Sequence, residues 1–457
     1  MGNIANTYYP QSGRLVILGA GESGVGAAIL GKDKSFDVFV SDMGMIAEAY
    51  RVQLEQEGIL FEMGKHTEEQ ILNADLVVKS PGIPEKAPLI KKLREKGTPV
   101  ISEIEFAAQY TDAKLICITG SNGKSTTTML TYYMFQKAGV NVGLAGNIGK
   151  SFALQVAREQ FDVYILEMSS FMLDDMYHFR ADVAVLLNIT PDHLDRYDYD
   201  MEKYVNSKFR IIQNQRSSDY FIYCADDEET MKALPRFDSK ATQLPMSQKK
   251  ILAQGASLDK DHNIIIHIPN REAFAMNIEE LSLQGKHNTY NNMASGLVAK
   301  AQELRNETMK ESMGSYVNIA HRLEHVAYIG GVNYINDSKA TNVNSVWYAL
   351  ESFSPDIILL LGGVDKGNDY EMLRDLVRQK VKAIICIGKD TSRIHDALEE
   401  EVEVIVNSAS MEDAVRIASH LAKKGDTVLL SPACASFDWF KNYEERGDKF
   451  KEAVMAL

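Results

Sequence analysis

Short apolar runs alternate with longer amphipathic segments along most of the chain. The runs Leu15 to Leu18, Leu115 to Ile118 and Ile357 to Leu361 each lead into a glycine-containing turn. Short apolar runs bounded by turns are typical of buried strands, whereas segments such as Glu371 to Lys380 have the periodicity of a helix. Alternation of such strands and helices predicts an α/β protein with parallel sheets.

The chain is too long for a single core, since domains usually contain about 100–200 residues. We expect three domains among its 457 residues, at 1–105, 106–318 and 319–457. Between Asp238 and Ile278 the pattern changes to short alternating runs, such as Asn263 to Ile268. Part of the middle domain is therefore predicted to be antiparallel.

Composition and charge narrow the class of protein. The formal net charge is −14, and no basic block would follow a phosphate backbone, which argues against nucleic acid as a partner. No stretch approaches the roughly 20 apolar residues that cross a bilayer, and the N-terminus lacks the features of a secretion signal. We expect a cytoplasmic protein without a membrane partner, and a monomer, since no coiled coil or interface stripe is evident.

The four cysteines lie far apart, at Cys117, Cys224, Cys386 and Cys434, with no CxxC spacing. Three of them stand among apolar or small residues. Buried thiols are therefore expected rather than disulfides or a zinc site.

A first glycine-rich loop follows the run at Leu15. Gly19, Gly21 and Gly24 fit GxGxxG, a pattern that lets the backbone approach a pyrophosphate at a helix N-terminus. Asp42 follows the next apolar run, where a dinucleotide-binding domain places its ribose-binding acid. Gly82, in a Pro-Gly turn after another strand, could line the same crevice. Taken alone, this half fits an NAD site, a site for another nucleotide diphosphate, or glycines that serve only tight packing.

A second glycine-rich loop, TGSNGKST at 119–126, is more specific. It stands between a strand and the helix-like run Thr127 to Ala138, although Ile118 occupies the place of the first glycine in the full P-loop pattern. Consecutive backbone N–H groups in such a loop form an anion nest, Lys124 can reach the terminal phosphates, and Ser125 can ligate magnesium. ATP is the ligand that this loop predicts.

A carboxylate supports this interpretation. Glu167 ends the strand-like run that begins at Tyr164. At a strand end beside a P-loop, an acid can hold the magnesium that neutralises charge on the phosphates. Without the P-loop, Glu167 would be interpreted as a surface acid.

Motifs spread over nearly the whole chain resemble those of the Mur ligase family. They are TGSNGKST (119–126), GNIG (146–149), LEMSSF (166–171), NITPDHLDRY (188–197), SKFRI (207–211), GKHNTYNN (285–292), AHRLE (320–324), INDSKATN (335–342), LLLGGVDKG (359–367) and SPACASFDWFKNYEERG (431–447). The last three are similar to the branch that adds D-glutamate. The Asp-Asn-Pro-Arg motif of relatives that add a diamino acid is absent from the sequence.

The resemblance implies a fold and a reaction. The fold would be an N-terminal Rossmann-like domain that binds the UDP-linked substrate, a central P-loop ATPase-like domain, and a C-terminal Rossmann-like domain that binds the amino acid. ATP would phosphorylate the carboxylate of UDP-N-acetylmuramoyl-L-alanine, and D-glutamate would attack the acyl phosphate through a tetrahedral intermediate. This step belongs to the synthesis of peptidoglycan precursors for the cell wall. Two Mg²⁺ ions would assist, and Mn²⁺ could replace them.

The resemblance also implies roles for individual residues. The catalytic residues would be Lys124, Glu167, His193 and Lys208, and the metal ligands Ser125, Glu167, His193 and a carbamylated Lys208. ATP would contact Gly120, Ser121, Asn122, Gly123, Lys124, Ser125, Thr126, Asn288, Asn291, Arg322, Asp337 and Lys339. The UDP-linked substrate would contact Gly21, Glu22, Ser23, Asp42, Gly82, Asn147 and His193. D-Glutamate would contact Thr341, Lys366, Ser436, Phe437 and Tyr443.

The chain departs from the family pattern in its first domain. Glu22 and Ser23 replace the apolar residue and Thr that the family often has, and Met43-Gly44 stands where some relatives have Thr-Arg. A basic residue from elsewhere would have to replace that arginine. Other functions left open are a related Mur-type or folylpolyglutamate-type ligase for another amino acid, an NAD-dependent dehydrogenase and a non-catalytic ATP-binding switch.

Overall fold

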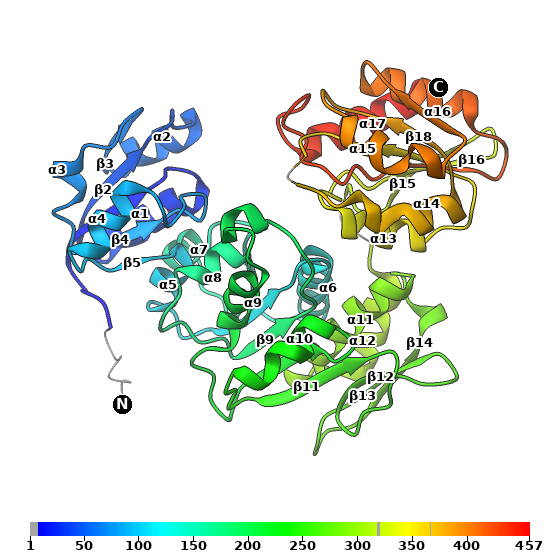
Figure 1. Cartoon of the computed structure of the whole chain (residues 1–457). Coiled ribbons are helices and arrows are strands. Elements are labelled where there is room, and N and C mark those ends of the chain that lie inside the picture. Colours follow the sequence, from blue (N-terminus) through cyan, green and yellow to red (C-terminus); the bar gives the residue numbers. More distant parts are fainter. Residues whose placement is uncertain (1–7, 318–319, 366) are drawn as a thin grey trace. The chain divides into compact units, whose positions relative to one another are not determined.

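The computed structural model describes residues 8–317, 320–365 and 367–457. By its internal contacts the chain divides into two units. The first runs to Ile189 and also includes Arg196–Asn277 and Tyr290–Met313; the second contains Thr190–Asp195, Ile278–Thr289 and Gly314–Leu457. Within them lie three sheets, which Figure 1 shows with their helices.

The N-terminal sheet has five parallel strands in the order β3-β2-β1-β4-β5. The strands are β1 (Gly13–Leu18), β2 (Phe36–Asp42), β3 (Leu60–Met63), β4 (Leu76–Lys79) and β5 (Val100–Ile101); the helices are α1 (Glu22–Asp33), α2 (Glu48–Gln56), α3 (Glu68–Ile71), α4 (Pro88–Glu95) and α5 (Glu103–Ala108). Strand order reverses at β1, whose neighbours are β2 and β4. In open parallel sheets, ligands bind beyond the carboxyl ends of the strands at such a switch point.

One glycine of the first loop is required by packing. A Cβ atom at Gly24 would lie 1.9 Å from the carbonyl oxygen of Gly19. Helix α1 can therefore start tightly against the end of β1 only with glycine at this place. At Gly21 a Cβ atom would meet nothing within 4 Å.

The central sheet has nine strands in the order β14-β13-β12-β11-β10-β9-β6-β8-β7. The strands are β6 (Lys114–Thr119), β7 (Val142–Gly146), β8 (Val163–Glu167), β9 (Val183–Leu186), β10 (Tyr220–Cys224), β11 (Thr242–Ser247), β12 (Gly255–Leu258), β13 (Asn263–His267) and β14 (Phe274–Asn277); the helices are α6 (Lys124–Lys137), α7 (Phe152–Arg158), α8 (Ser170–Asp174), α9 (Met201–Phe209), α10 (Glu228–Ala233), α11 (Lys286–Ala301) and α12 (Asn306–Ser315), with 3₁₀ turns at Leu194–Tyr197, Arg210–Ile212, Leu234–Arg236 and Ile278–Glu280.

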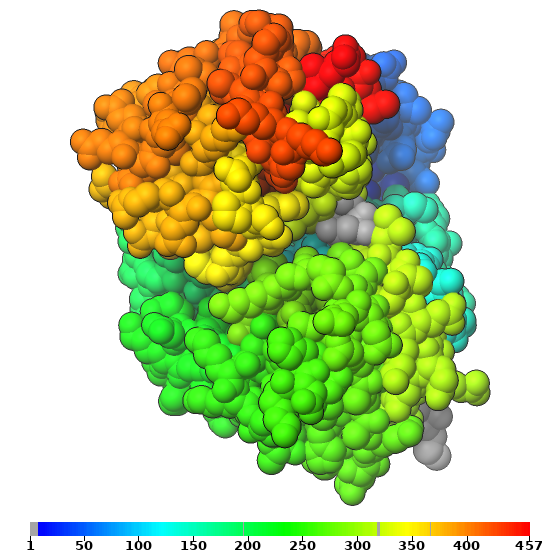
Figure 2. Space-filling view, turned by 90° about the vertical axis from the view of Figure 1, so that its right-hand side faces the viewer, coloured from blue at the N-terminus to red at the C-terminus, as the bar shows by residue number. Residues whose placement is uncertain are grey.

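Strands β6 to β12 of this sheet pair in parallel, whereas β12, β13 and β14 pair antiparallel. The predicted antiparallel part of the middle domain is thus confirmed. Buried and exposed side chains alternate along β13, where Ile264 and Ile266 are buried and His267 is exposed. This part of the sheet therefore has one face toward the core, as is common in antiparallel sheets. Side chains close the spaces between the ribbons of this region into a continuous surface (Figure 2, green).

The C-terminal sheet has six strands in the order β15-β16-β20-β17-β18-β19, parallel except for the β15–β16 hairpin. The strands are β15 (Glu324–Ile329), β16 (Val332–Asn336), β17 (Ile357–Leu361), β18 (Val381–Cys386), β19 (Val404–Asn407) and β20 (Thr427–Leu430); the helices are α13 (Val343–Glu351), α14 (Arg374–Lys380), α15 (Ser392–Leu398), α16 (Met411–Leu421) and α17 (Tyr443–Met455), with 3₁₀ turns at Tyr370–Leu373 and Glu399–Glu401.

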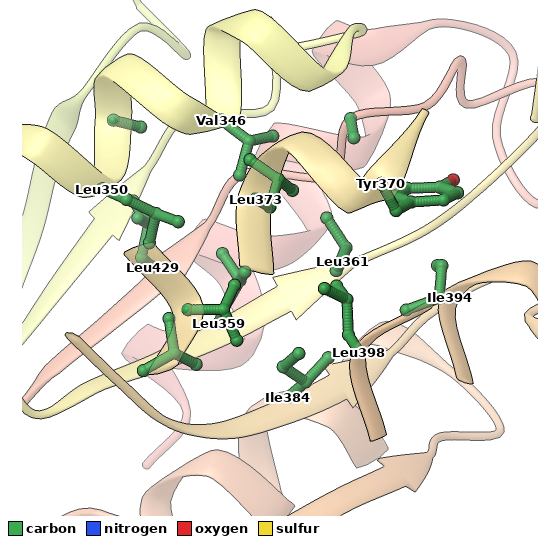
Figure 3. Packing of buried hydrophobic residues seen from close by; sticks show 14 of the residues in the cluster. Val346, Leu350, Leu359, Leu361, Tyr370, Leu373, Ile384, Ile394, Leu398 and Leu429 are labelled. Atoms are coloured by element: carbon green, nitrogen blue, oxygen red, sulfur yellow. The ribbon is translucent and has the colours of Figure 1, made fainter. Parts of the chain in front are cut away.

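The continuous apolar run of β17 is buried on both faces of this sheet. Leu359 and Leu361 belong to one core cluster, and Ile358 and Leu360 to the cluster on the other face. In Figure 3, Leu359 lies among residues of the first cluster together with Leu373. Full burial of such a side chain stabilises the fold by about 1.5–3 kcal/mol, which explains why the run is apolar at every position.

The observed architecture confirms the predicted α/β class with three sheet-based domains. The boundary at 105/106 stays a prediction, and the boundary at 318/319 lies outside the described residues. All four cysteines are buried and free, as expected. Within the described part of the chain, none of the helices has the length and apolar character needed to cross a bilayer.

Candidate active site

The phosphate loop connects β6, the third strand from the β7 edge of the nine-stranded sheet, to α6. Gly123 precedes the first residue of α6 and has φ of 83°, a left-handed conformation that glycine adopts without strain. Lys124 Nζ donates to the carbonyl oxygens of Gly120 and Ser121, each at 2.8 Å. The loop backbone thus surrounds the ammonium group of Lys124. Ser125 and Thr126 are buried at the start of α6.

Asn188, which follows β9, supports this loop from the neighbouring strand. Its side chain accepts from the Asn122 N–H at 2.9 Å and donates to the Asn122 carbonyl at 3.1 Å, while its carbonyl accepts from the Ser121 N–H at 3.0 Å. Sequence reasoning gave Asn188 no role, although it is the first residue of NITPDHLDRY. The signal was available, because β9 is adjacent to β6 and both strands end at the same edge.

Glu167 ends β8 on the other side of β6, where Ile118 is its partner in register. Its side chain is fully buried, and Oε1 accepts from Asn147 Nδ2 at 2.7 Å. Oε2 is also buried and has no hydrogen-bond partner among the described residues. An unsatisfied buried carboxylate oxygen is costly, and a hard cation such as Mg²⁺ is the kind of ligand that would satisfy it.

Lys208, in α9, reaches the same loop. Its side chain is 2% exposed, and Nζ donates to the Gly120 carbonyl at 2.9 Å and to Thr119 Oγ1 at 3.4 Å. Lys124 and Lys208 therefore share one carbonyl oxygen as acceptor. The family resemblance implied that both lysines belong to one site, and in the structure their ammonium groups lie at the same loop.

The first glycine loop is organised by Asp42. Its Oδ2 accepts from the Ala20 N–H at 2.6 Å and its Oδ1 from the Gly44 N–H at 2.7 Å, so the carboxylate joins the ends of β1 and β2. Glu22, predicted to contact a nucleotide substrate, accepts through Oε1 from the Ser151 N–H at 3.1 Å. Its carboxylate thus contacts the start of α7 in the central domain.

His193 lies in the segment Thr190–Asp195, which belongs to the second unit. Its backbone is left-handed, with φ of 53°. Nε2 lies 3.7 Å from Asp192 Oδ1. Within the described chain, no cluster of three or more His, Cys, Asp and Glu side chains forms a ready-made metal cage.

The predicted adenine-side residues divide between the two units. Both asparagines lie in α11, where Asn288 Nδ2 donates to the Gln284 carbonyl at 2.9 Å and Asn291 Oδ1 accepts from Thr127 Oγ1 at 3.2 Å. In the second unit, the ring of His287 stacks on Tyr348 with centroids 4.2 Å apart.

Asp337 is buried at the end of β16. Its Oδ2 accepts from Ser431 Oγ at 2.8 Å and its Oδ1 from the Leu323 N–H at 3.2 Å. Burial raises the pKa of Asp337 to about 6, and the nearby charge of Arg322 opposes that rise. Two of the three third-domain residues predicted to contact ATP, Arg322 and Asp337, thus interact electrostatically.

The predicted D-glutamate residues differ in their contacts and burial. Tyr443 Oη lies 3.1 Å from Nζ of Lys339, a residue predicted to contact ATP, and this Nζ lies 5.0 Å from the centre of the Tyr443 ring. Ser436 is buried, whereas Phe437 is 70% exposed and Thr341 is half-buried. Lys366 lies outside the described residues.

Family models match three successive parts of the chain. They are the Mur ligase MurD-like N-terminal domain at residues 13–102, the Mur ligase middle domain at 118–299, and the Mur ligase glutamate ligase domain at 321–434. Each match corresponds to one of the three sheets.

Curated relatives are similar over nearly the full length. The UDP-N-acetylmuramoylalanine--D-glutamate ligase of Bacteroides fragilis is 55% identical over 445 residues, which cover 97% of this chain and 100% of the relative. The enzyme of the same name from Salinibacter ruber is 41% identical over 452 residues, covering 97% and 98%.

Solved structures share the fold at lower identity. A pseudomurein peptide ligase type C from Methanothermus fervidus has a TM-score of 0.63 at 18% identity and covers 97% of this chain and 99% of its own. The MurF ligase of Thermotoga maritima, solved in complex with ADP, has a TM-score of 0.60 at 15% identity, with coverage of 92% and 95%. With a phosphate loop, a buried acid and a buried lysine at one sheet edge, and with family models matching all three domains, the chain belongs to the Mur ligase family.

Proposed function

We propose that this protein joins D-glutamate to UDP-N-acetylmuramoyl-L-alanine with hydrolysis of ATP to ADP and phosphate, a step in the synthesis of peptidoglycan precursors. The observation that carries the proposal is the identity of 55%, over 97% of the chain, to a relative named for this reaction. The phosphate loop and its buried neighbours give that likeness a chemical basis.

The loop from Gly120 to Thr126 would hold the ATP phosphates. The Ser121 and Asn122 N–H groups donate to Asn188, so the donors for phosphate would come from the backbone N–H groups after Asn122. Lys124 supplies a positive charge that can move from the carbonyls of Gly120 and Ser121 to a triphosphate. The carbonyl oxygens of Gly120 and Ser121 that accept from this lysine are neutral, and a charge-assisted hydrogen bond to an anionic phosphate is stronger than a bond to a neutral acceptor. ADP in the Thermotoga MurF structure supports adenine nucleotides as ligands of this fold.

Residues of this site fit a magnesium ion. The unsatisfied Glu167 Oε2 supplies a buried anionic oxygen, and the Ser125 hydroxyl a neutral one. When bound, Mg²⁺ would neutralise charge that develops on the transferred phosphoryl group. Asn147 holds the other oxygen of Glu167 and so fixes the orientation of the carboxylate.

Lys208 has a physical reason to be carbamylated. Two ammonium groups that donate to the one Gly120 carbonyl repel each other in a buried site, where charge is poorly screened. Carbamylation would turn the Lys208 cation into an anion, replacing repulsion by attraction and adding oxygen ligands. Such a carbamate would suit a second Mg²⁺ or a substituting Mn²⁺, and His193 stays a prediction as a metal ligand.

The chemistry needs two steps after binding. The substrate carboxylate attacks the γ-phosphorus of ATP and gives an acyl phosphate and ADP. The D-glutamate amine then attacks the acyl carbon, loses a proton, and expels phosphate to leave the amide. Both steps depend on positioning and on stabilising negative charge, which is what a cationic loop in a buried site supplies.

For the uridine diphosphate, we assign the missing positive charge to Lys65. The Gly64 N–H donates to the Gly44 carbonyl at 3.0 Å, which places the end of β3 beside the end of β2. Lys65, the next residue, is exposed. It can therefore replace, from the neighbouring strand, the arginine that some relatives carry at position 44.

D-Glutamate would bind in the second unit. Its side-chain carboxylate needs cationic and hydroxyl donors. Ser436 and Tyr443 offer hydroxyl groups after β20 and at the start of α17, and Lys339, which is predicted to contact ATP, has its ammonium group 3.1 Å from the Tyr443 hydroxyl. Lys366, Thr341 and Phe437 stay predictions for the same site.

Substrate dependence of ADP release tests the function. We expect release only when UDP-N-acetylmuramoyl-L-alanine, D-glutamate and Mg²⁺ are all present. ADP release with another amino acid in place of D-glutamate would indicate a different ligase. NADH oxidation would indicate a dehydrogenase, and ATP turnover indifferent to D-glutamate would indicate a switch.

A further inference from the structure

A tight turn follows β4 at the switch point of the first sheet. The Ile83 N–H donates to the Ser80 carbonyl at 3.1 Å, which closes a β-turn with Pro81 and Gly82 at its centre. Ser80 also packs on the first glycine loop, because its N–H donates to the Leu18 carbonyl at 2.8 Å. A change in this turn therefore alters the surface on which a nucleotide diphosphate would lie.

Arg196, three residues after His193 in the sequence, holds the centre of this turn. Its Nη2 donates to the Pro81 carbonyl at 3.0 Å and its Nη1 to the Gly82 carbonyl at 3.1 Å. The guanidinium carbon lies 4.4 Å from the ring centre of Phe171, so the group is stacked while it donates. Arg196 and Phe171 belong to the central domain, whereas the turn belongs to the first.

The last carbonyl of the turn is also engaged. Lys79 Nζ donates to the Ile83 carbonyl at 2.8 Å and lies 2.8 Å from the carboxylate of Asp175. The carbonyl oxygens of Ser80, Pro81, Gly82 and Ile83 thus all have donors.

The backbone donors of the turn are arranged differently. Pro81 has no N–H, and the Gly82 N–H has no acceptor within the part of the chain that the structure describes, where Gly82 is exposed. Carbonyl oxygens repel phosphate, and backbone N–H groups bind it. With its carbonyls engaged by two cations, the turn can offer its remaining donor to an anionic ligand.

We propose that Arg196 is a positioning residue for the sugar-nucleotide substrate: it draws the carbonyls of Pro81 and Gly82 into the protein and so presents the donor side of the turn to the diphosphate. This inference rests on the proposed function, because it takes the substrate to be a nucleoside diphosphate derivative. It adds a residue of the central domain to the binding of a ligand that the first domain holds.

The test measures the dissociation constants of three ligands by calorimetry: UDP, UDP-N-acetylmuramoyl-L-alanine and Mg-ATP. For Arg196→Ala we expect binding of both uridine ligands to weaken at least tenfold, with Mg-ATP binding changed less than twofold. Arg196→Lys should bind the uridine ligands more tightly than Arg196→Ala but less tightly than wild type. An ammonium group lacks the planar guanidinium that donates to two carbonyls while it stacks on Phe171. Phe171→Leu should give a smaller loss in the same direction.

Arg158→Ala is the matched control. Arg158 also joins the central domain to the first, through Asp33 at 2.6 Å and Glu57 at 2.7 Å, but it does not touch the turn. We expect it to leave the affinity for UDP within twofold. An equal loss in Arg158→Ala would show that the effect is a general loosening of the two domains and would overturn the proposal.

Ionic strength separates positioning from direct contact. If Arg196 bound the diphosphate itself, its contribution would shrink as salt rises from about 50 to about 300 mM, because screening weakens charge–charge attraction. Because it binds neutral carbonyls, we expect the ratio of wild-type to variant affinity to stay constant. A ratio that falls severalfold with salt would refute the positioning role. Wild-type protein that binds no uridine ligand would instead refute the proposed function, whereas unchanged UDP affinity in Arg196→Ala would refute this inference alone.

Discussion

A carboxyl group buried between the first and central domains should contribute to the pH dependence of stability. Glu103 begins α5 and is 4% exposed. Its Oε1 accepts from Ser151 Oγ and from the Ala153 N–H, each at 2.7 Å. Burial raises the pKa of Glu103 from 4.5 to about 7, and the charge of Glu22 adds to the rise, while the hydrogen bonds from α7 oppose it.

The magnitude follows from proton linkage. Because the folded-state pKa lies above the unfolded value, the folded protein binds more protons than the unfolded chain between pH 4.5 and about 7. The contribution of Glu103 to the free energy of unfolding therefore falls as pH rises through this window, by about 3 kcal/mol in total. Glu103→Gln keeps an oxygen acceptor for Ser151 and Ala153 but cannot ionise. The measured quantity is the free energy of unfolding of the variant minus that of wild type. This difference should be about 3 kcal/mol larger at about pH 8 than at about pH 5.

Urea denaturation of the full chain, followed by far-UV circular dichroism at several pH values, measures this difference. Glu69→Gln is the control, since Glu69 is an exposed carboxylate of the same domain. We expect its stability difference from wild type to vary little with pH. A difference between Glu103→Gln and wild type that stays constant over the window would refute the reasoning, because it would mean that Glu103 is equally acidic in both states.

Three further predictions concern the site. Lys124→Ala should lower ligation at least about 100-fold, as expected for loss of a charge that stabilises a phosphoryl transition state, with an unchanged circular dichroism spectrum; near-normal turnover would contradict this. Lys208→Ala should be largely inactive and partly restored by a small added carboxylate such as acetate, and failure of rescue with normal metal binding would argue against carbamylation. Lys65→Ala should raise KM for the UDP-linked substrate about 3- to 10-fold with little change in kcat, consistent with an exposed charge worth about 1 kcal/mol. Gly44→Arg in that background should restore KM and Lys91→Ala should have no effect; a normal KM in Lys65→Ala would exclude the assignment.

Much of the fold could be predicted because its signals are local. The run Ile357 to Leu361 is apolar at every position because both faces of β17 are buried. A run of five apolar residues bounded by turns indicates such a strand from the sequence alone. The phosphate loop was predictable for a similar reason, since a left-handed Gly123 and a cationic Lys124 must be adjacent in sequence to act on one ligand.

The contacts that support the site could not be predicted in the same way. Arg196 lies 115 residues from Pro81, and an arginine is compatible with many partners, so its sequence position does not indicate which carbonyls it binds. The resemblance assigned Glu22 to a nucleotide substrate, and this stays a prediction; the hydrogen bond that its carboxylate accepts from Ser151 of another domain was not predicted. Such pairings depend on how sheets are placed against each other, which a local pattern does not encode.

The buried cysteines make this protein convenient for site-specific labelling. Burial raises the pKa of the Cys224 and Cys386 thiols to about 12 and that of Cys434 to about 11, and it raises the pKa of Cys117 as well. Maleimides react with thiolates, which are scarce at neutral pH for such groups. A single cysteine introduced on each unit should therefore accept a fluorophore selectively, without removal of any native residue. Energy transfer between the two dyes can then test whether the distance between them changes during turnover.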